Sequence, residues 1–443
     1  GLLFSNPAHA GFFPRRAGPG RSVRNIEFLS KTQYSFPFSG AISAPFVFSG
    51  AQQMVSALMA TYNRLPVSFA KGEGAWLWDT DGKRYLDALS GIAVCSLGHA
   101  HPAITAAICA QASTLVHTSN VYGIVNQQKL GEALTALSGM DRVFFSNSGA
   151  EANEAAIKLA RLHGHARGIA EPTIIVMENS FHGRTMATLT ATGNRKAQAG
   201  FEPLLRGFTR VPYGDLDAVR QIAASAHKIA AVLVEPVQGE GGINIPEAGY
   251  LAGIREICDR QDWLMIVDEI QSGMSRTGSW FAFQQEDIQP DVMTLAKALG
   301  NGMPIGACLA RGKAAELFAP GSHGSTFGGN PLACAAGLAV VETMQEQKMP
   351  EIAARLGNRI VNGLHSALGD ADIVTEIRHK GCMIGIELDR PCSDLVSKAL
   401  EAGLLINVTA GNVIRLLPPL VMNDEEADQL VKGLAAIITE LPA

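Results

Sequence analysis

The chain has 443 residues, of which 47% are hydrophobic and 17% charged, so it is long enough for two or three domains with sizeable cores. Its net charge of −5 disfavours nucleic acid or an anionic membrane surface as a partner, and its apolar runs are too short to span a bilayer. The seven cysteines have neither a C-x-x-C pair nor a metal-like spacing, which indicates buried thiols in a reducing, cytoplasmic compartment.

Residues 1–53 differ from the rest because they carry five basic residues against one acid. Arginine-rich, acid-poor leaders resemble organelle transit peptides, which would place the protein in an organelle. Alternatively, translation starts at Met54, the first methionine, and the leader is not native. We favour the second account and expect a disordered or non-native segment without a catalytic role.

Residues 62–88 have a sequence pattern typical of strands with tight turns, and Asp81-Gly82 between apolar stretches predicts a hairpin. A helix is predicted from 103 to 116. His99 and His101 just before it could suggest a metal, but no further ligands stand at a suitable spacing. We therefore predict a loop there and no metal.

The block from 142 to 161 joins a strand, a turn of small residues and an amphipathic helix. Ser148 and Glu151 match a capping box at the start of that helix. Backbone N–H groups at a helix N-terminus favour a negatively charged ligand, so a phosphate would fit near Gly149. Many turns between a strand and a helix look alike, so this signal alone is weak.

Two further strands are predicted at 173–177 and 230–234. The first is followed by Phe181 and Arg184, an aromatic ring that could stack on a ligand and an arginine that could hold a carboxylate. Strands and helices keep alternating at the spacing of βαβ units. This alternation predicts a mainly parallel sheet that is covered on both faces.

Two continuous apolar runs, 263–267 and 291–296, end at Asp268 and Lys297. Both read as buried strands of a parallel sheet, and such sheets bind ligands beyond the carboxyl ends of their strands. A lysine amine can form a Schiff base with an aldehyde cofactor, while a carboxylate can keep a pyridine nitrogen protonated. The alternative is an ordinary buried aspartate and a lysine that reaches solvent from a strand end.

After Pro350 the composition becomes more mixed and predicts a smaller α+β domain. The predicted helices span 351–368, 393–402 and 424–440, and the predicted strands span 382–388, 404–408 and 412–417.

Read together, six motifs resemble the class III aminotransferases, which are pyridoxal-phosphate enzymes of fold type I. The motifs lie at 148–152, 181–185, 234–242, 267–271, 294–297 and 326–330. The resemblance covers the chain from about Met54 to its end. It implies an α/β fold whose large domain has a mainly parallel seven-stranded sheet between helices, with a smaller C-terminal α+β domain joined by an N-terminal segment. The expected boundaries are 54–102 for that segment, 103–340 for the large domain and 341–443 for the small domain.

The resemblance also implies roles for individual residues. Lys297 would bind pyridoxal 5'-phosphate covalently and then move the substrate proton, and Asp268 would pair with the ring nitrogen. The other implied cofactor contacts are Gly149 and Ala150 on the phosphate, Gln271 near the phenolic oxygen, Phe181 on the ring face, and Thr326 on the phosphate from a neighbouring subunit. A homodimer with shared active sites is therefore expected.

For the substrates, the resemblance implies that Arg184 binds an α-carboxylate and that Ser325 and Tyr62 also contact substrate, Ser325 across the dimer interface. Arg415 resembles the second arginine of the family, with Glu240 as a partner that turns aside when a dicarboxylic oxo acid arrives. The alternative for this pair is a plain structural salt bridge, which would contribute little if it were exposed.

Within the family, the sequences around Tyr62 and at 91–99 most resemble those of the members that use N2-acetyl-L-ornithine. Ile92 stands where the ornithine enzymes tend to carry tyrosine, and an apolar wall favours an acylated nitrogen over a free ammonium. Cys95 departs from the asparagine that the acetylornithine enzymes often have.

The predicted reaction moves the δ-amino group of acetylornithine to 2-oxoglutarate. The alternative donors are ornithine, succinyldiaminopimelate and 4-aminobutyrate. A pyridoxal-phosphate-binding regulator is disfavoured because 1–53 has no helix-turn-helix pattern.

Overall fold

The computed structural model describes residues 57–225, 227–369 and 371–441. Residues 64–443 form one compact unit, to which residues 57–63 do not belong. The predicted leader at 1–53 lies outside the described residues. Among the helices that are described, none is long and apolar enough to cross a membrane.

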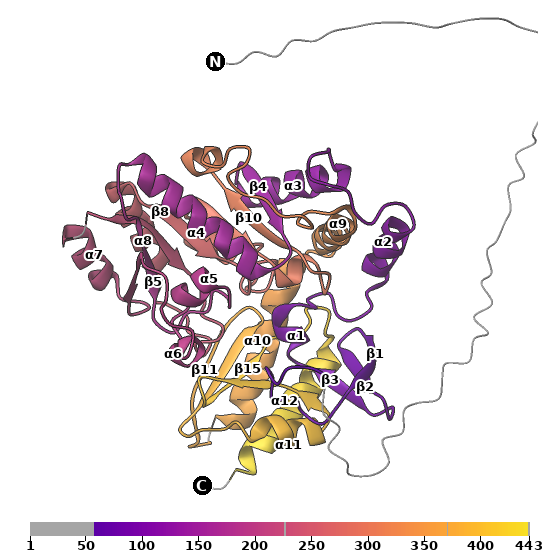
Figure 1. The fold of residues 1–443 in the computed structure, drawn as a ribbon. Helices are drawn as coiled ribbons and strands as arrows, with labels where there is room; N and C mark the ends of the chain where they lie inside the picture. Colours follow the sequence, from indigo (N-terminus) through magenta and orange to yellow (C-terminus); the bar gives the residue numbers. More distant parts are fainter. Residues whose placement is uncertain (1–56, 226, 370, 442–443) are drawn as a thin grey trace, which may run out of the picture. The chain divides into compact units, whose positions relative to one another are not determined.

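A seven-stranded sheet forms the centre of the compact unit, with the strand order β4-β10-β9-β8-β7-β5-β6 (Figure 1). The strands are β4 (Arg142–Ser146), β5 (Thr173–Met177), β6 (Phe208–Val211), β7 (Ile229–Val234), β8 (Leu264–Asp268), β9 (Val292–Leu295) and β10 (Gly306–Ala310). Strand β10 runs antiparallel to both of its neighbours, and the other neighbouring pairs are parallel. The predicted mainly parallel sheet is confirmed, and β6 and β10 are the two of its strands that were not predicted from the sequence.

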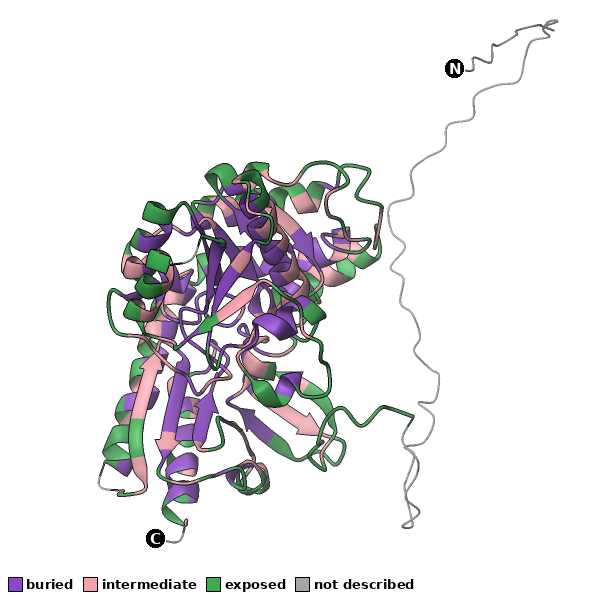
Figure 2. Ribbon diagram, turned by 60° about the vertical axis from the view of Figure 1, so that its left-hand side comes forward, coloured by how far each residue is buried: buried purple, intermediate pink, exposed green. Residues whose placement is uncertain are grey.

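Helices cover both faces of this sheet, which explains why its strands are continuously apolar. Along β5, Ile174 and Val176 pack on one face with helices α4 (Gly149–Ala166) and α5 (Met186–Ala191). Ile175 and Met177 point to the opposite face, where α7 (Leu216–Ser225) and α8 (Tyr250–Gln261) pack. Successive side chains of a strand alternate between faces, so both sets are buried (Figure 2).

Three more helices pack together beside the β4–β10 end of the sheet. They are α2 (Pro102–Ala112), α3 (Val125–Ser138) and α9 (Pro331–Glu346). Helix α2 corresponds to the helix predicted at 103–116 and ends at Ala112, four residues before the predicted end. Short helical segments connect the larger elements: α1 (Ser90–Ala93), α6 (Arg195–Gln198), η1 (Ala282–Glu286), η2 (Lys297–Leu299) and η3 (Gly312–Glu316).

The C-terminal part has its own antiparallel sheet with the order β11-β12-β15-β14. Its strands are β11 (Val374–Lys380), β12 (Met383–Leu388), β14 (Asn407–Thr409) and β15 (Val413–Leu416), and its helices are α10 (Met349–Leu368), α11 (Leu395–Glu401) and α12 (Asp424–Thr439). The predicted α+β composition is confirmed, although β11 was not predicted.

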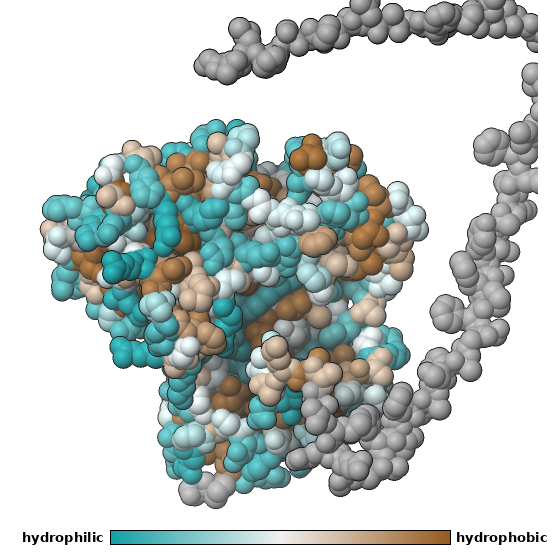
Figure 3. Space-filling view, in the orientation of Figure 1, coloured by the Kyte–Doolittle hydropathy of each residue, from teal (hydrophilic) through white to brown (hydrophobic). Residues whose placement is uncertain are grey.

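The N-terminal strands β1 (Phe69–Glu73), β2 (Trp76–Asp79) and β3 (Arg84–Asp87) form the predicted hairpin and extend it. Strand β3 also pairs in parallel with β13 (Leu404–Leu405), so the N-terminal segment joins the C-terminal part through a shared sheet. The exact domain boundaries remain a prediction, because residues 64–443 pack as one unit. The face of this unit in Figure 3 is hollowed at its centre.

Candidate active site

A pocket of roughly 420 Å³ lies beyond the carboxyl ends of β7, β8 and β9. Each of these strands is followed by one ionisable residue that lines the pocket: Glu235 after β7, Asp268 at the end of β8, and Lys297 after β9. The pocket is also lined by the predicted residues Gly149, Ala150, Phe181, Arg184 and Gln271. The structure therefore brings together seven of the twelve predicted site residues.

Lys297 is brought beside Asp268 because β8 and β9 are neighbours in the sheet. The two strands pair in parallel, with Asp268 opposite Thr294, three residues before the lysine. Lys297 has φ of 45°, in the left-handed region that few non-glycine residues adopt. Such strained conformations concentrate at functional sites, where the surrounding structure holds them in place.

The environment of Lys297 favours its neutral amine. Burial is the main cause that lowers the pKa of Lys297 to about 8; Arg415 acts in the same direction, while Glu240 and Asp268 act in the opposite one. A lysine with a pKa near 8 is partly neutral at physiological pH, and the neutral amine is the form that attacks a carbonyl carbon.

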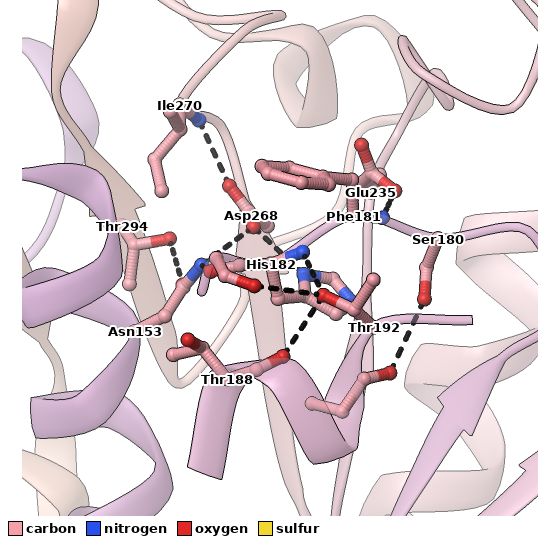
Figure 4. Close-up of polar contacts among 12 residues, drawn as sticks. Asn153, Ser180, Phe181, His182, Thr188, Thr192, Glu235, Asp268, Ile270 and Thr294 are labelled. Carbon is pink, nitrogen blue, oxygen red and sulfur yellow. Dashed lines mark hydrogen bonds and ion pairs between the residues drawn. The ribbon is translucent and has the colours of Figure 1, made fainter. Parts of the chain in front are cut away.

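The Asp268 carboxylate is held by three hydrogen-bond donors, although it is almost fully buried (Figure 4). Its Oδ2 accepts from Asn153 Nδ2 and from His182 Nδ1, both at 2.8 Å. Its Oδ1 accepts from the Ile270 backbone N–H at 3.1 Å. Donors to a carboxylate stabilise its charged form, so Asp268 is arranged to present a negative charge to the pocket.

Asn153 fixes this arrangement, and the sequence reading did not identify it. Its Oδ1 accepts from Thr294 Oγ1 at 2.8 Å, and its Nδ2 also donates to the His182 carbonyl at 2.9 Å. The asparagine thus ties β9 and the 182 loop to the Asp268 carboxylate (Figure 4). The available signal was a polar residue among the alanines of the buried face of α4, between Ala152 and Ala155.

Glu235 is a second ionisable group that the sequence reading did not assign to the site. Burial raises the pKa of Glu235 to about 7, with Asp268 acting in the same direction. Its Oε2 accepts from the Phe181 backbone N–H at 3.0 Å, which holds the aromatic residue at the pocket wall.

The N-terminus of α4 offers unpaired backbone donors to the pocket. Among the described residues, no acceptor bonds the N–H groups of Gly149 or Ala150. A Cβ on Gly149 would lie 2.8 Å from Ile270 Cδ1, so glycine permits this close packing. Ser148 Oγ accepts from the Glu151 N–H as predicted, but the Glu151 carboxylate bonds the Asn147 N–H, so only half of the predicted capping box forms.

Arg415 and Glu240 form the ion pair that was predicted from the sequence, with 2.6 Å between Nη1 and Oε1. The Arg415 side chain is fully buried and Glu240 is 34% exposed, so the pair is largely shielded from solvent, and the structural salt bridge of the alternative reading stays open. Arg415 Nε donates to Asn407 Oδ1 at 2.8 Å. Its Nη2 is buried and has no partner within the described part of the chain.

Thr326 and Ser325 do not line the pocket. Thr326 is exposed, and Ser325 accepts a hydrogen bond from Asn147 Nδ2 at 3.2 Å. Tyr62 belongs to residues 57–63, which the structure does not place relative to the pocket. Ile92, the proposed apolar wall, packs in a cluster with Val237 and Ile243, and it is Val94 that lines the pocket.

The donor set fits pyridoxal phosphate. The pocket offers an amine to a carbonyl group, a buried carboxylate to a ring nitrogen, an aromatic residue to a ring face, and free N–H groups at a helix N-terminus to a phosphate. The residues named above supply each of these groups at one pocket.

Comparisons with known proteins agree with this reading. The family model described as "Aminotransferase class-III" matches residues 58–438. The chain is 60% identical to the acetylornithine aminotransferase of Nitrosomonas europaea, over 87% of this chain and 98% of that protein. It is 50% identical to the acetylornithine aminotransferase of Methanothermobacter thermautotrophicus, over 87% and 97%.

Solved structures give the same result. The acetylornithine aminotransferase of Elizabethkingia anophelis matches with a TM-score of 0.79 and 40% identity, over 86% of this chain and 96% of that one. The ornithine aminotransferase of Toxoplasma gondii matches with a TM-score of 0.83 and 36% identity, over 87% and 94%. A second structure of the Toxoplasma enzyme is described with pyridoxal phosphate at its active site.

Proposed function

The chain belongs to the class-III aminotransferase family, and from this premise we propose that it transfers the δ-amino group of N2-acetyl-L-ornithine to 2-oxoglutarate. The products are N-acetylglutamate 5-semialdehyde and glutamate, in arginine biosynthesis. The family makes the chain a pyridoxal-phosphate-dependent aminotransferase that acts on an amino donor and an oxo acid. The choice of donor is supported by 60% identity to an acetylornithine aminotransferase along almost its whole length.

When bound, pyridoxal phosphate supplies an aldehyde that takes up an amino group and a ring that withdraws electrons. We propose that Lys297 would hold the aldehyde carbon through its neutral amine and would also act as the group that moves the substrate proton. Its pKa of about 8 supports both roles, because the amine can give up and take up a proton near neutral pH. Asp268, whose carboxylate accepts hydrogen bonds from Asn153 and His182, would keep the ring nitrogen protonated.

The pocket geometry supports the remaining proposed cofactor contacts. The free N–H groups of Gly149 and Ala150 would bind the phosphate at the N-terminus of α4, where the helix dipole favours negative charge. Phe181 would lie against the ring, and Gln271 would donate to the phenolic oxygen.

Two arginines would bind the substrate carboxylates. Arg184 lines the pocket and is exposed, and it is available to the α-carboxylate of the donor. We propose that Arg415 and Glu240 act as a movable pair: Glu240 neutralises Arg415 while the amine donor reacts and releases it when 2-oxoglutarate brings a second carboxylate. The buried, unpartnered Nη2 of Arg415 supports this role, because a guanidinium can bind a carboxylate through two nitrogens.

A homodimer would complete the site. Exposed apolar residues gather near the end of α2 and the start of α3 (Figure 3). They are Leu115, Val116, Val121, Tyr122, Val125 and Phe327. Phe327 is held beside this group, because its ring lies 5.3 Å from that of His117 and Asn120 donates to Ser325 O and Gly328 O. A partner subunit that covers this surface would bury the patch and receive Thr326 and Ser325 into its own pocket.

Mixing two inactive variants tests the shared site. Lys297→Ala and Thr326→Ala subunits each carry one defect, and a mixed dimer has one site with both intact residues. If subunits exchange freely, half the dimers are mixed and about a quarter of the wild-type activity should return. No recovery, in a preparation that is dimeric and exchanged, would contradict a site built from both subunits.

An amine panel with one acceptor tests the donor. Purified enzyme should prefer acetylornithine over ornithine, succinyldiaminopimelate and 4-aminobutyrate, and double-reciprocal plots at several fixed 2-oxoglutarate concentrations should be parallel. A strong preference for free ornithine would replace the proposed donor. A Lys297→Ala variant that still retained the cofactor after borohydride treatment would remove the lysine from its role.

We also propose that the protein works in the reducing cytoplasm. All seven cysteines are free, and five of them are buried: Cys258, Cys308, Cys334, Cys382 and Cys392. Cell fractionation with an antibody against the chain tests this location, and recovery in an organelle would overturn it.

A further inference from the structure

A second cavity, of roughly 930 Å³, adjoins the pocket. Phe181 and Arg184 line both spaces, so the cavity meets the pocket along the wall that they form. Its other walls come from the turn after β5, the segment around α6, the loop after β7 and the turn between β14 and β15. A molecule in this cavity would therefore lie next to the proposed substrate arginines.

The cavity lining is positively charged, although the chain carries a net charge of −5. Its four cationic residues are Arg184, Arg195, Lys196 and Arg210, and its two acids are Glu178 and Glu240. Glu240 is already paired with Arg415. Within the described ranges, none of the four cations forms an ion pair. The positive charge of this wall is therefore only partly balanced by protein groups.

The fold holds two of these cations outward on a short, anchored turn. Ala197 and Gln198 of α6 are buried, and Gln198 Nε2 donates to the Thr192 carbonyl at 2.8 Å. Arg195 and Lys196, on the same turn, are exposed. The anchoring of 197–198 fixes the direction in which the two preceding side chains leave the backbone, so their charge stays at the cavity wall.

Arg210 is the fixed cation of the group. Its Nη2 donates to the carbonyls of Thr190 and Thr192, at 2.8 and 2.9 Å. Burial lowers the pKa of Arg210, and Arg195 lowers it further, while Glu178 acts in the opposite direction. Two arginines that repel each other at a cavity wall destabilise the empty protein, and an anion between them would relieve the repulsion.

We propose that Arg195, Lys196 and Arg210 form an outer anion site that attracts the dicarboxylic oxo acid to the mouth of the pocket. The identity of the two substrates rests on the proposed function. 2-Oxoglutarate carries two negative charges and is attracted by each cation. Acetylornithine carries one carboxylate and one ammonium group, whose interactions with the same cations largely cancel. The outer site therefore favours the acceptor over the donor.

The double variant Arg195→Gln/Lys196→Gln tests this site in the holoenzyme, because both side chains are exposed and their removal leaves the anchored turn intact. For two cations about 10 Å from a dianion, we expect kcat/KM for 2-oxoglutarate to fall roughly five- to tenfold at ~10 mM salt and less than about twofold at ~1 M. The kcat value should not change, and kcat/KM for acetylornithine should change less than about twofold.

Arg220→Gln/Lys228→Gln is the matched control. It removes the same charge from two exposed residues that do not line the cavity, and it should leave kcat/KM for 2-oxoglutarate within about twofold of the wild type. An equal loss in the control, an equal loss for both substrates, no loss for 2-oxoglutarate, or a loss that persists at high salt would each overturn the proposal.

Glutarate separates this proposal from the proposed function. It has two carboxylates and no group that can exchange an amine, so calorimetric titration of the holoenzyme measures dianion binding without turnover. The cavity variant should bind glutarate roughly five- to tenfold more weakly than the wild type at ~10 mM salt. Unchanged binding would overturn the outer site, whereas a different preferred donor in the amine panel would overturn only the proposed function.

Discussion

Replacing Glu240 with glutamine removes the charge that neutralises Arg415 and keeps the size of the side chain. A hydrogen bond to a charged group contributes about 1.5–3 kcal/mol and a neutral one about 1 kcal/mol. The interaction between residue 240 and Arg415 should therefore become weaker by roughly 1 kcal/mol. This free-energy change is at the low end of the range because Glu240 is 34% exposed and solvent screens its interaction with Arg415. Arg415 would then be more available to a substrate carboxylate.

The expected result of Glu240→Gln is a change in the choice of substrate. Glutamate has a side-chain carboxylate that can bind the released Arg415, and acetylornithine has none. The ratio of kcat/KM for glutamate to kcat/KM for acetylornithine should therefore rise about fivefold, since 1.4 kcal/mol is a factor of ten. Steady-state assays of the two half-reactions, with each amine in turn, measure this ratio.

Glu387→Gln provides the matched control. Glu387 pairs with Arg378 at 2.6 Å, the same N–O distance as in the Glu240 pair, and is also 34% exposed. It should lose a similar amount of stability and leave the substrate ratio unchanged. If both variants leave the ratio unchanged and lose equal stability in thermal unfolding, the Arg415–Glu240 pair is a structural salt bridge and the switch is refuted.

Three further predictions follow from the same pocket. Gly149→Ala should weaken cofactor binding, measured by absorbance titration, by about tenfold, because the new Cβ would lie 2.8 Å from Ile270 Cδ1. Adding Ile270→Val removes that methyl group and should restore most of the affinity. The rate of covalent attachment of the cofactor to the apoenzyme should rise with pH through about 8 and level off above it, because burial lowers the pKa of Lys297 to about 8. Stopped-flow absorbance measures this rate. A midpoint near pH ~10 in the plot of rate against pH would contradict Lys297 as the attacking amine. Asn153→Leu should lower kcat by roughly tenfold, because the Asp268 anion loses one donor; an unchanged kcat at saturating substrate would limit Asn153 to a structural role.

The sequence predicted the parallel core of the fold because its strands carry an unmistakable pattern. The run at 263–267 is apolar at every position, and the run at 291–296 is apolar except for Asp291 and Thr294. They correspond to β8 and β9, which are buried along their whole length. Asp268 and Lys297, which follow these runs, meet at one pocket because parallel neighbouring strands end at the same edge of the sheet. Strand β10 was missed because Gly306–Ala310 is rich in glycine and alanine, which are uncommon in strands, and β6 was missed because Phe208–Val211 is only four residues long.

What the sequence determined by itself is the set of chemical groups and the strand ends that carry them. What only the tertiary structure decided is how those groups are held: Asn153, His182 and Thr294 lie far from Asp268 in sequence and meet it only because α4, the 182 loop and β9 pack against β8. The cationic cavity lining around Arg195 and Arg210 could not be predicted from the sequence for the same reason. Hydrogen bonds and charge clusters depend on distances in space, and packing of distant segments sets those distances.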